Sequence, residues 1–99
     1  MVELHFDSFD WDEGNRTKSL KKHGLNESAI EAFFETGPTI ADDVKHSGHE
    51  PRFLAVGKNP EGRWMIVSFT LRAQAGRHCL RPISARYMHA REVKDYEKA

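Results

Sequence analysis

Arginine is the residue type that stands out for its chemistry in this 99-residue chain. Between Glu61 and Glu92 the sequence contains no carboxylate, and every Lys or Arg in that stretch is an arginine. A guanidinium group carries five donors in a planar fork that matches a phosphate. The stretch therefore predicts an anion-binding surface, with a solvated strand face paired to acids elsewhere as the alternative. The six arginines are Arg63, Arg72, Arg77, Arg81, Arg86 and Arg91.

The net charge of the whole chain does not show how unevenly its charges are distributed. Fifteen basic and fifteen acidic residues give a net charge of zero, which usually argues against nucleic acid as a partner. Residues 1–50 hold five basic and eleven acidic residues, whereas residues 51–99 hold ten basic and four acidic ones. The chain is therefore a charge dipole, and its second half is a candidate surface for nucleic acid.

Length and composition limit the class of protein. With 38% hydrophobic and 30% charged residues, the sequence predicts one soluble domain over residues 1–99. No segment approaches the roughly 20 apolar residues that a bilayer requires, and the start of the chain lacks the pattern of a secretory signal. The single cysteine, Cys79, has no partner for an internal disulfide. We expect a cytoplasmic protein that contacts no membrane.

The elements that must position the arginines begin with a strand and a helix. Residues 3–9 alternate polar and apolar side chains, which predicts a short strand. Asp10 is followed three residues later by Glu13, the spacing of a capping box. A helix is then expected to run to His23 and to end at Gly24 in a left-handed C-cap.

A second helix is predicted immediately afterwards, with Asn26 as its N-cap and Gly37-Pro38 at its end. The rest of the chain predicts an antiparallel meander and a C-terminal helix, which gives an α+β fold. Pro82 lacks a backbone donor and therefore predicts a bulge or an edge position in its strand. The expected strands are 39–41, 52–57, 64–70 and 77–86, with a loop at 42–51 and the last helix at 90–98.

Three arginines fall where the predicted strands begin or end. Arg72 and Arg86 lie at the ends of neighbouring strands, and Arg52 begins a third. We expect their guanidinium groups to converge on one phosphate.

Several short blocks of sequence occur together in a specific order and at specific spacings. They are Phe9-Asp10-Trp11-Asp12, Lys22-His23-Gly24, Glu50 with Arg52, Thr70 with Arg72, Ile83-Ser84-Ala85-Arg86, and Glu92 with Tyr96. On these blocks the chain resembles the BrnT-type toxins of bacterial type II toxin–antitoxin pairs over nearly its whole length. Three positions depart from the usual pattern of that family. Asn15 replaces a lysine, Ser19 an asparagine and Pro82 an aliphatic residue.

The resemblance implies a RelE-like fold and a translation-blocking endoribonuclease that cleaves RNA without a metal or other cofactor. It also implies neutralisation by a cognate antitoxin, BrnA-like, with a ribbon-helix-helix DNA-binding domain. Operator DNA would then be contacted only through the antitoxin.

Metal-free RNA cleavage needs a base for the 2′-hydroxyl proton, cations for the pentavalent phosphorus and an acid for the leaving oxygen. Glu50 is the expected base, held ionised by Arg52, and His23 and His46 are candidate acids. The predicted catalytic group is Glu50, Arg52, Arg72, Arg86 and His23. The predicted RNA contacts are Lys22, Arg77, Arg81, Arg91 and Tyr96.

Structural roles are open for some of these residues. Glu50 and Arg52 also fit a surface ion pair, His23 fits a cap on the helix dipole, and Tyr96 fits the core. His46 and His49 are three residues apart, but no further clustered ligand accompanies them, so no zinc site is expected.

Two other functions are also open. A degenerate toxin would bind its antitoxin and repress the operon without cleaving RNA, which the departures at Asn15 and Ser19 motivate. A nuclease that acts on DNA is the other alternative, because contacts between arginine and phosphate do not read the sugar.

Overall fold

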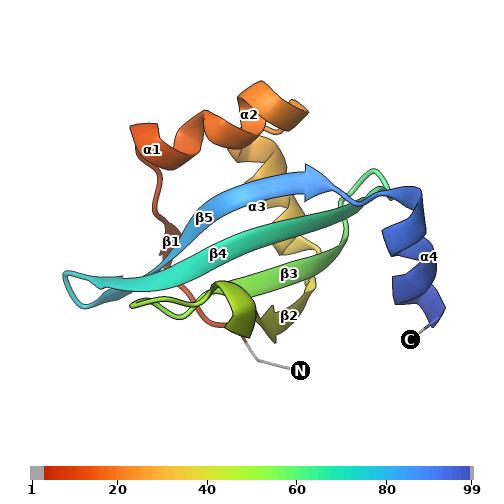
Figure 1. Cartoon of the computed structure of the whole chain (residues 1–99). Helices are drawn as coiled ribbons and strands as arrows, with labels where there is room; N and C mark the ends of the chain where they lie inside the picture. The colour runs from red at the N-terminus through yellow and green to blue at the C-terminus, as the bar shows by residue number, and fades with distance from the viewer. Residues whose placement is uncertain (1–3, 99) are drawn as a thin grey trace.

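The computed structural model describes residues 4–98 and has the α+β fold that the sequence predicts. Its elements follow the expected order along the chain (Figure 1). They are β1 (Ser8–Phe9), α1 (Glu13–Arg16), α2 (Lys18–His23), α3 (Glu27–Glu35), β2 (Thr39–Asp42), a 3₁₀ turn (Val44–His46), β3 (Phe53–Lys58), β4 (Trp64–Gln74), β5 (Arg77–Tyr87) and α4 (Ala90–Lys98).

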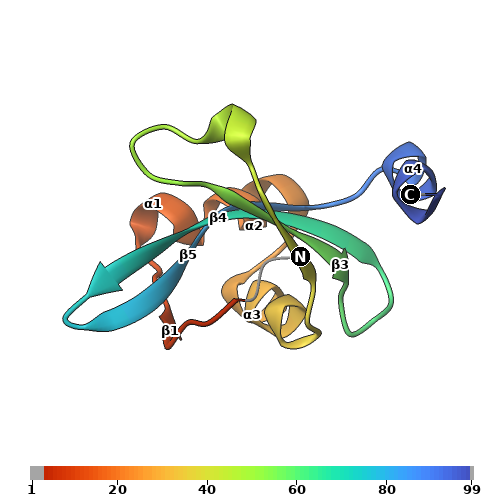
Figure 2. The same cartoon turned by 90° about the horizontal axis from the view of Figure 1, so that it is seen from below.

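The strands form one five-stranded sheet in the order β1-β5-β4-β3-β2. Strands β2 to β5 pair antiparallel, and β1 pairs parallel with β5. Helix α3 covers one face, and the loop of residues 43–52 stands over the other face (Figure 2). Helices α1 and α2 run along β5, while α4 projects from the end of the sheet (Figure 1).

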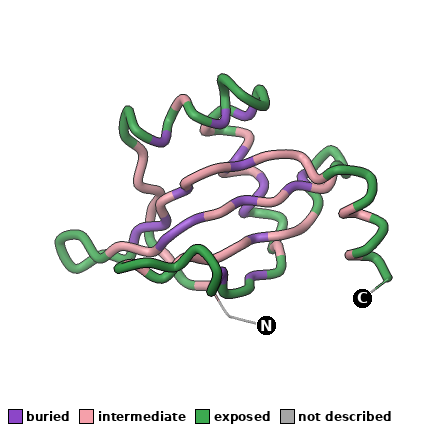
Figure 3. Tube along the Cα trace, viewed as in Figure 1, coloured by how far each residue is buried: buried purple, intermediate pink, exposed green. Residues whose placement is uncertain are grey.

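The core lies between α3 and one face of the sheet, and the buried residues lie along α3 and the central strands (Figure 3). Phe33 and Phe34 of α3 are buried, and the Phe34 ring meets Phe69 of β4 edge-on at 5.4 Å between centroids. Met65 and Val67 of β4 are also fully buried on this face. Burial of each such side chain contributes roughly 1.5–3 kcal/mol, so this layer anchors β4 at the centre of the sheet.

The irregularity predicted from Pro82 is a β-bulge in β5. Adjacent residues of β4 pair with Pro82 and Ser84, so Ile83 is the extra residue. An extra residue reverses the alternation of faces along a strand. Leu80 and Ala85 are therefore both buried in the core although five residues separate them.

The same reversal determines which side chains of β5 lie on the open face of the sheet, which is the face away from α3. Arg81 pairs with Thr70 before the bulge, and Arg86 pairs with Ile66 after it. Both arginines consequently lie on the open face, where a regular strand would place them on opposite faces.

Two expectations for the start of the chain are wrong. The strand covers only Ser8–Phe9, residues 4–7 lie outside regular structure, and Glu3 lies outside the described residues. The first helix is capped by Asp12 rather than Asp10, and it breaks at Thr17 into α1 and α2. The reason is that Asn15, and not Glu13, completes the capping box with Asp12 and ties this turn to β5.

The remaining helix signals are confirmed. Gly24 ends α2 in the left-handed conformation at φ 70°, where a side chain would be strained. The Asn26 side chain accepts from the backbone N–H of Ala29 and so caps α3. In residues 4–98 no helix is both long and apolar enough to cross a membrane.

Candidate active site

A cleft lies on the open face of the sheet, beneath the loop of residues 43–52. Its volume is about 210 Å³, and polar and charged side chains predominate in its walls. We call it the sheet cleft. Its lining residues are Asp43, His46, Arg52, Leu54, Ile66, Ser68, Ser84 and Arg86.

Asp43 and His46 form a pair at one wall of the sheet cleft. The Nδ1 atom of His46 lies 3.1 and 3.0 Å from the two carboxylate oxygens of Asp43. Asp43 is buried, whereas the His46 side chain is 59% exposed. A carboxylate that accepts from Nδ1–H orients the ring and leaves Nε2 as the nitrogen available to a ligand. The pair therefore has the arrangement of a positioned acid–base group.

Sequence reasoning identified His46 as a candidate acid but missed Asp43. The signal was their spacing of three residues, because a 3₁₀ turn places residues i and i+3 on the same side. The loop around them is tied together at its base. The Asp43 N–H donates to the Arg52 carbonyl at 2.8 Å, and the Ser47 hydroxyl donates to the Asp43 carbonyl at 2.8 Å.

Arg52 lies in the sheet cleft with its guanidinium group uncommitted. No hydrogen bond or ion pair joins that group to any residue within 4–98. The expectation that Arg52 holds Glu50 ionised is met only in part, because the hydrogen bonds of Arg72 are the largest cause of the lowered Glu50 pKa and the charge of Arg52 is a smaller one. Arg52 and its neighbour Thr70 also line a second hollow beside the loop. The Arg52 guanidinium group can therefore bind an anion without breaking a hydrogen bond or ion pair within residues 4–98.

Arg86 lies on the opposite side of the sheet cleft and binds Glu92 of α4. The two N–H···O distances are 2.7 and 2.9 Å. The hydrogen bonds from Arg86, together with the backbone N–H of His89, lower the pKa of Glu92 to about 2. Glu92 in turn raises the pKa of the Arg86 guanidinium. The Nε–H of Arg86 has no partner among the described residues and remains available.

A second cleft of about 240 Å³ adjoins the first and brings in α2. We call it the helix cleft. It shares Ser84 and Arg86 with the sheet cleft, so the two form one track over β5. Lys22 and His23, predicted for RNA binding and catalysis, both lie in it, and both are exposed. Its lining residues are Lys18, Ser19, Lys22, His23, Ser84, Ala85 and Arg86.

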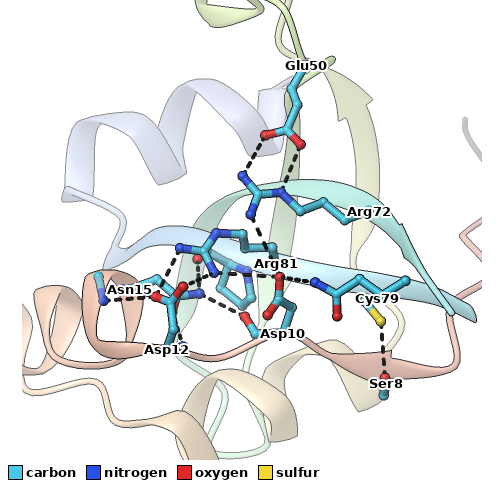
Figure 4. Close-up of polar contacts among 11 residues, drawn as sticks. Ser8, Asp10, Asp12, Asn15, Glu50, Arg72, Cys79 and Arg81 are labelled. Atoms are coloured by element: carbon cyan, nitrogen blue, oxygen red, sulfur yellow. Dashed lines mark hydrogen bonds and ion pairs between the residues drawn. The ribbon is translucent and has the colours of Figure 1, made fainter.

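A row of alternating charges occupies the other end of the open face (Figure 4). We call Asp12, Arg81, Asp10, Arg72 and Glu50 the charge ladder. Arg81 lies 2.9 Å from Asp12 and 3.6 Å from Asp10, and Arg72 lies 4.0 Å from Asp10. Arg72 also donates two hydrogen bonds to Glu50, at 2.9 and 3.0 Å.

Partners within the ladder account for its shifted pKa values. The hydrogen bonds from Arg72 lower the pKa of Glu50, and the hydrogen bond from Arg81 lowers the pKa of Asp12. The Arg81 side chain, predicted to bind RNA, is only 12% exposed. Within the ladder the arginines are paired with carboxylates of the chain itself.

The expectation that Arg52, Arg72 and Arg86 converge on one phosphate is wrong. Arg72 pairs with Cys79 across β4 and β5, whereas Arg86 pairs with Ile66. Six residues along β4 separate the two positions, a distance of about 20 Å at the usual rise of a strand. Arg52 and Arg86 share the sheet cleft, and Arg72 belongs to the charge ladder.

Three further predicted RNA contacts lie away from both clefts. Arg77 begins β5 beside the turn after β4, and Arg91 lies exposed on α4. The Tyr96 ring meets Trp64 edge-on at 5.2 Å between centroids, which helps to hold α4 against the sheet. The structure therefore does not gather Arg77, Arg91 and Tyr96 with the cleft residues.

Asn15 and Ser19, the two departures in the first helical segment, serve the edge of β5. Beyond β1 that edge has no strand neighbour, so its backbone groups need other partners. The Asn15 Nδ2 atom donates to the Pro82 carbonyl at 2.8 Å, and the Ala85 N–H donates to the Ser19 hydroxyl at 2.8 Å. Both departures therefore have structural roles at the edge of β5.

Two hydroxyl groups on the open face lack such partners. The Ser68 and Thr70 oxygens are buried, and neither makes a hydrogen bond within residues 4–98. Ser68 lines the sheet cleft, and Thr70 lines the hollow beside it. Both oxygens are thus buried without a hydrogen-bond partner in the described part of the chain.

His46 and His49 gather no further metal ligands. In the part of the chain that the structure describes, no three His, Cys, Asp or Glu side chains are grouped so that they could hold a metal ion.

Comparison with known proteins identifies the family. The family model described as "Ribonuclease toxin, BrnT, of type II toxin-antitoxin system" matches residues 11–92. The crystal structure of the Brucella abortus ribonuclease toxin BrnT has a similar fold, with a TM-score of 0.59 and 24% sequence identity. The similarity covers 83% of this chain and 96% of that one. No curated protein sequence matches. The chain belongs to the BrnT family of toxins from type II toxin–antitoxin systems.

Proposed function

We propose that this protein is an endoribonuclease that cleaves RNA in the sheet cleft without a metal ion. The observation that carries the proposal is the Asp43–His46 pair in the same cleft as the free guanidinium group of Arg52. The description of the family as ribonuclease toxins supports the same activity. Single-stranded RNA then follows the track from the helix cleft across Arg86 into the sheet cleft.

The residues of the two clefts together supply the groups for transfer of the phosphate to the neighbouring 2′-oxygen. His46, oriented by Asp43, takes the proton from the ribose 2′-hydroxyl, and the oxygen attacks phosphorus. Arg52 and the Nε–H of Arg86 stabilise the charge on the pentavalent phosphorus. The bond to the 5′-oxygen breaks, and His23 is the candidate acid that protonates it. The products are a 2′,3′-cyclic phosphate and a 5′-hydroxyl.

This chemistry distinguishes RNA from DNA. The nucleophile is the 2′-hydroxyl of the substrate, and DNA has none at that position. An RNA with a single 2′-deoxy sugar at the cleaved position is therefore expected to resist cleavage at that site while it still binds.

The decisive experiment follows cleavage of a labelled single-stranded RNA by the purified protein in EDTA. We expect wild-type protein to cut the RNA and to leave a cyclic phosphate, and we expect His46→Ala to lose at least 100-fold in rate. Val44→Ala is the matched control, since Val44 is 81% exposed in the same loop and lines neither cleft. Cleavage that requires added metal, or full activity in His46→Ala, would contradict the proposal.

We also propose that a cognate antitoxin covers the sheet cleft with an acidic segment. Membership in a type II toxin family implies such a partner, and the exposed cations of the two clefts favour negative charge. A BrnA-like antitoxin with a ribbon-helix-helix domain would link this chain to operator DNA. Affinity for the antitoxin is then expected to fall as salt rises, and an affinity independent of ionic strength would contradict an electrostatic cover.

A further inference from the structure

The loop of residues 43–52 carries three residues of the sheet cleft, so its position decides the geometry there. Asp43, His46 and Arg52 all belong to it. At its base the loop is fixed, because the Asp43 N–H bonds to the Arg52 carbonyl and the Arg52 N–H donates to the Ser47 hydroxyl at 3.0 Å. These contacts shape the loop, but they do not fasten its far part to the sheet.

One side-chain contact, between Glu50 and Arg72, joins the far part of the loop to β4. Glu50 accepts hydrogen bonds at 2.9 and 3.0 Å from the Nε and Nη2 atoms of Arg72, which projects from β4. Within residues 4–98, no other side-chain hydrogen bond or ion pair joins residues 43–52 to β4 or β5. The bidentate geometry fixes orientation as well as distance.

We call the contact between Glu50 and Arg72 the anchor. The rest of the charge ladder restrains its Arg72 side. Asp10 lies between Arg72 and Arg81, and Arg81 is held by Asp12, the N-cap of α1 (Figure 4). Arg72 is therefore restrained on the side away from Glu50. The loop is tied through this row of charges to the start of the helical segment on the far side of β5.

This arrangement differs from that of a general base. The Glu50 carboxylate is directed at the guanidinium group of Arg72, and both oxygens accept from it. Glu50 lines the hollow beside the loop, with His46 and Arg52, and is not among the lining residues of the sheet cleft. Proton abstraction in the cleft is already assigned to His46.

We propose that Glu50 and Arg72 are positioning residues, which hold the loop so that His46 and Arg52 face the phosphate in the sheet cleft. This inference rests on the proposed ribonuclease function. It replaces the sequence-based role of Glu50 as base.

The test compares two substitutions of Glu50. Glu50→Ala removes the anchor, and a misplacement of about 1 Å at a reacting group costs up to about 100-fold, so we expect kcat/KM for RNA to fall 10- to 100-fold. Glu50→Gln keeps an oxygen that accepts from Arg72 but cannot act as a base, and it is expected to retain activity within about fivefold of wild type. A Gln variant as inactive as the Ala variant, with the wild-type pH dependence lost, would show that Glu50 is a base and overturn the inference.

Arg72 provides the second arm of the test. Arg72→Ala should reproduce the loss in Glu50→Ala, and the double variant should lose no more than either single variant, because one contact is removed in all three. A double variant that loses the product of the two single effects would contradict a shared anchor.

A structural readout separates this inference from the proposed function. Amide hydrogen exchange of His46, Ser47 and Arg52, whose N–H groups are hydrogen-bonded within the loop, should accelerate at least tenfold in Glu50→Ala, while the urea midpoint of unfolding stays unchanged. If wild-type protein cleaves no RNA, the proposed function fails, and the exchange measurement still tests the anchor. Unchanged exchange in Glu50→Ala would overturn the anchor itself.

Discussion

The charge ladder and the sheet cleft lie on the same face of one sheet, and both contain arginine and aspartate side chains. In the ladder, Arg81 is only 12% exposed and each arginine has a carboxylate partner from the chain itself. In the cleft, Arg52 makes no hydrogen bond or ion pair within residues 4–98, and the Ser68 hydroxyl is unpaired. Residue type alone therefore does not distinguish an arginine that carboxylates of the chain hold in place from one without such a contact.

Arg86 combines features of the charge ladder and of the sheet cleft. It is paired with Glu92, as the arginines of the ladder are paired with their carboxylates, yet it lines both clefts and keeps one N–H free. A ligand phosphate at Arg86 would therefore meet a guanidinium group that is already oriented, and orientation before binding reduces the entropic cost of binding.

The largest expected effect comes from exchanging one arginine of each region for alanine. Arg52→Ala should lower kcat/KM for RNA about 100-fold with little change in stability, because it removes a charge aimed at the phosphate. Arg81→Ala should instead lower the free energy of unfolding by about 2 kcal/mol, because it removes a side chain that is only 12% exposed together with its contacts to Asp10 and Asp12. Cleavage kinetics and urea unfolding of both variants measure the contrast. The opposite pattern would remove the distinction between the two regions.

The second prediction concerns the edge of β5, where Asn15 and Ser19 supply hydrogen-bond partners to the backbone. Asn15→Leu leaves the Pro82 carbonyl and the Asp12 N–H without their hydrogen bonds, so we expect a loss of about 2 kcal/mol in the free energy of unfolding. Lys21→Leu, on the exposed side of α2, is the control and should change stability by less than about 0.5 kcal/mol. Equal stability of the two variants would show that Asn15 has no structural role.

The third prediction tests the contact of Arg86 with α4 through pH. The pKa of Glu92 is lowered from 4.5 to about 2, so the contact stabilises the folded state fully above pH 4.5 and is lost as the pH falls toward 2. An NMR titration of the Glu92 carboxyl group should give a midpoint near 2, and Arg86→Met should raise it toward 4.5. A wild-type midpoint near 4.5 would mean that the pair does not form in solution.

The smallest effect is expected for the unpaired hydroxyl groups. Ser68→Ala and Thr70→Val remove buried oxygens that make no hydrogen bond within residues 4–98, so stability should stay within about 0.5 kcal/mol or rise. Ser19→Ala is the matched control, because its hydroxyl accepts from the Ala85 N–H and its loss should cost about 1 kcal/mol. A loss in Ser68→Ala as large as in Ser19→Ala would show that an internal partner exists.

Much of the fold could be predicted from the sequence because local signals determine it. The Asn26 cap, the left-handed Gly24 and the bulge at Pro82 each act within a few residues of their position. The first strand and helix were predicted less well. Their geometry depends on Asn15, whose decisive partner is Pro82, 67 residues away.

The candidate site was only partly predictable for the same reason. Arg52, Arg86 and His46 were identified by residue type, and the structure places them in one cleft. From the sequence, the expected partner of Glu50 is Arg52, two residues away. In the structure its main partner is Arg72, 22 residues away. Pairings across a sheet depend on register, and one bulge changes that register for every later residue.

The bulge at Ile83 determines at once which residues of β5 enter the core and which lie on the open face. Absorbing Ile83 into the ladder without a bulge would turn Ala85 outward and Arg86 inward at the same time. Deletion of Ile83 would instead leave Pro82 and Ser84 as neighbours in a regular strand and keep both faces. A one-residue deletion between Leu80 and Arg86 can therefore be absorbed by loss of the bulge, whereas a one-residue insertion there needs a second bulge to keep Arg86 on the open face.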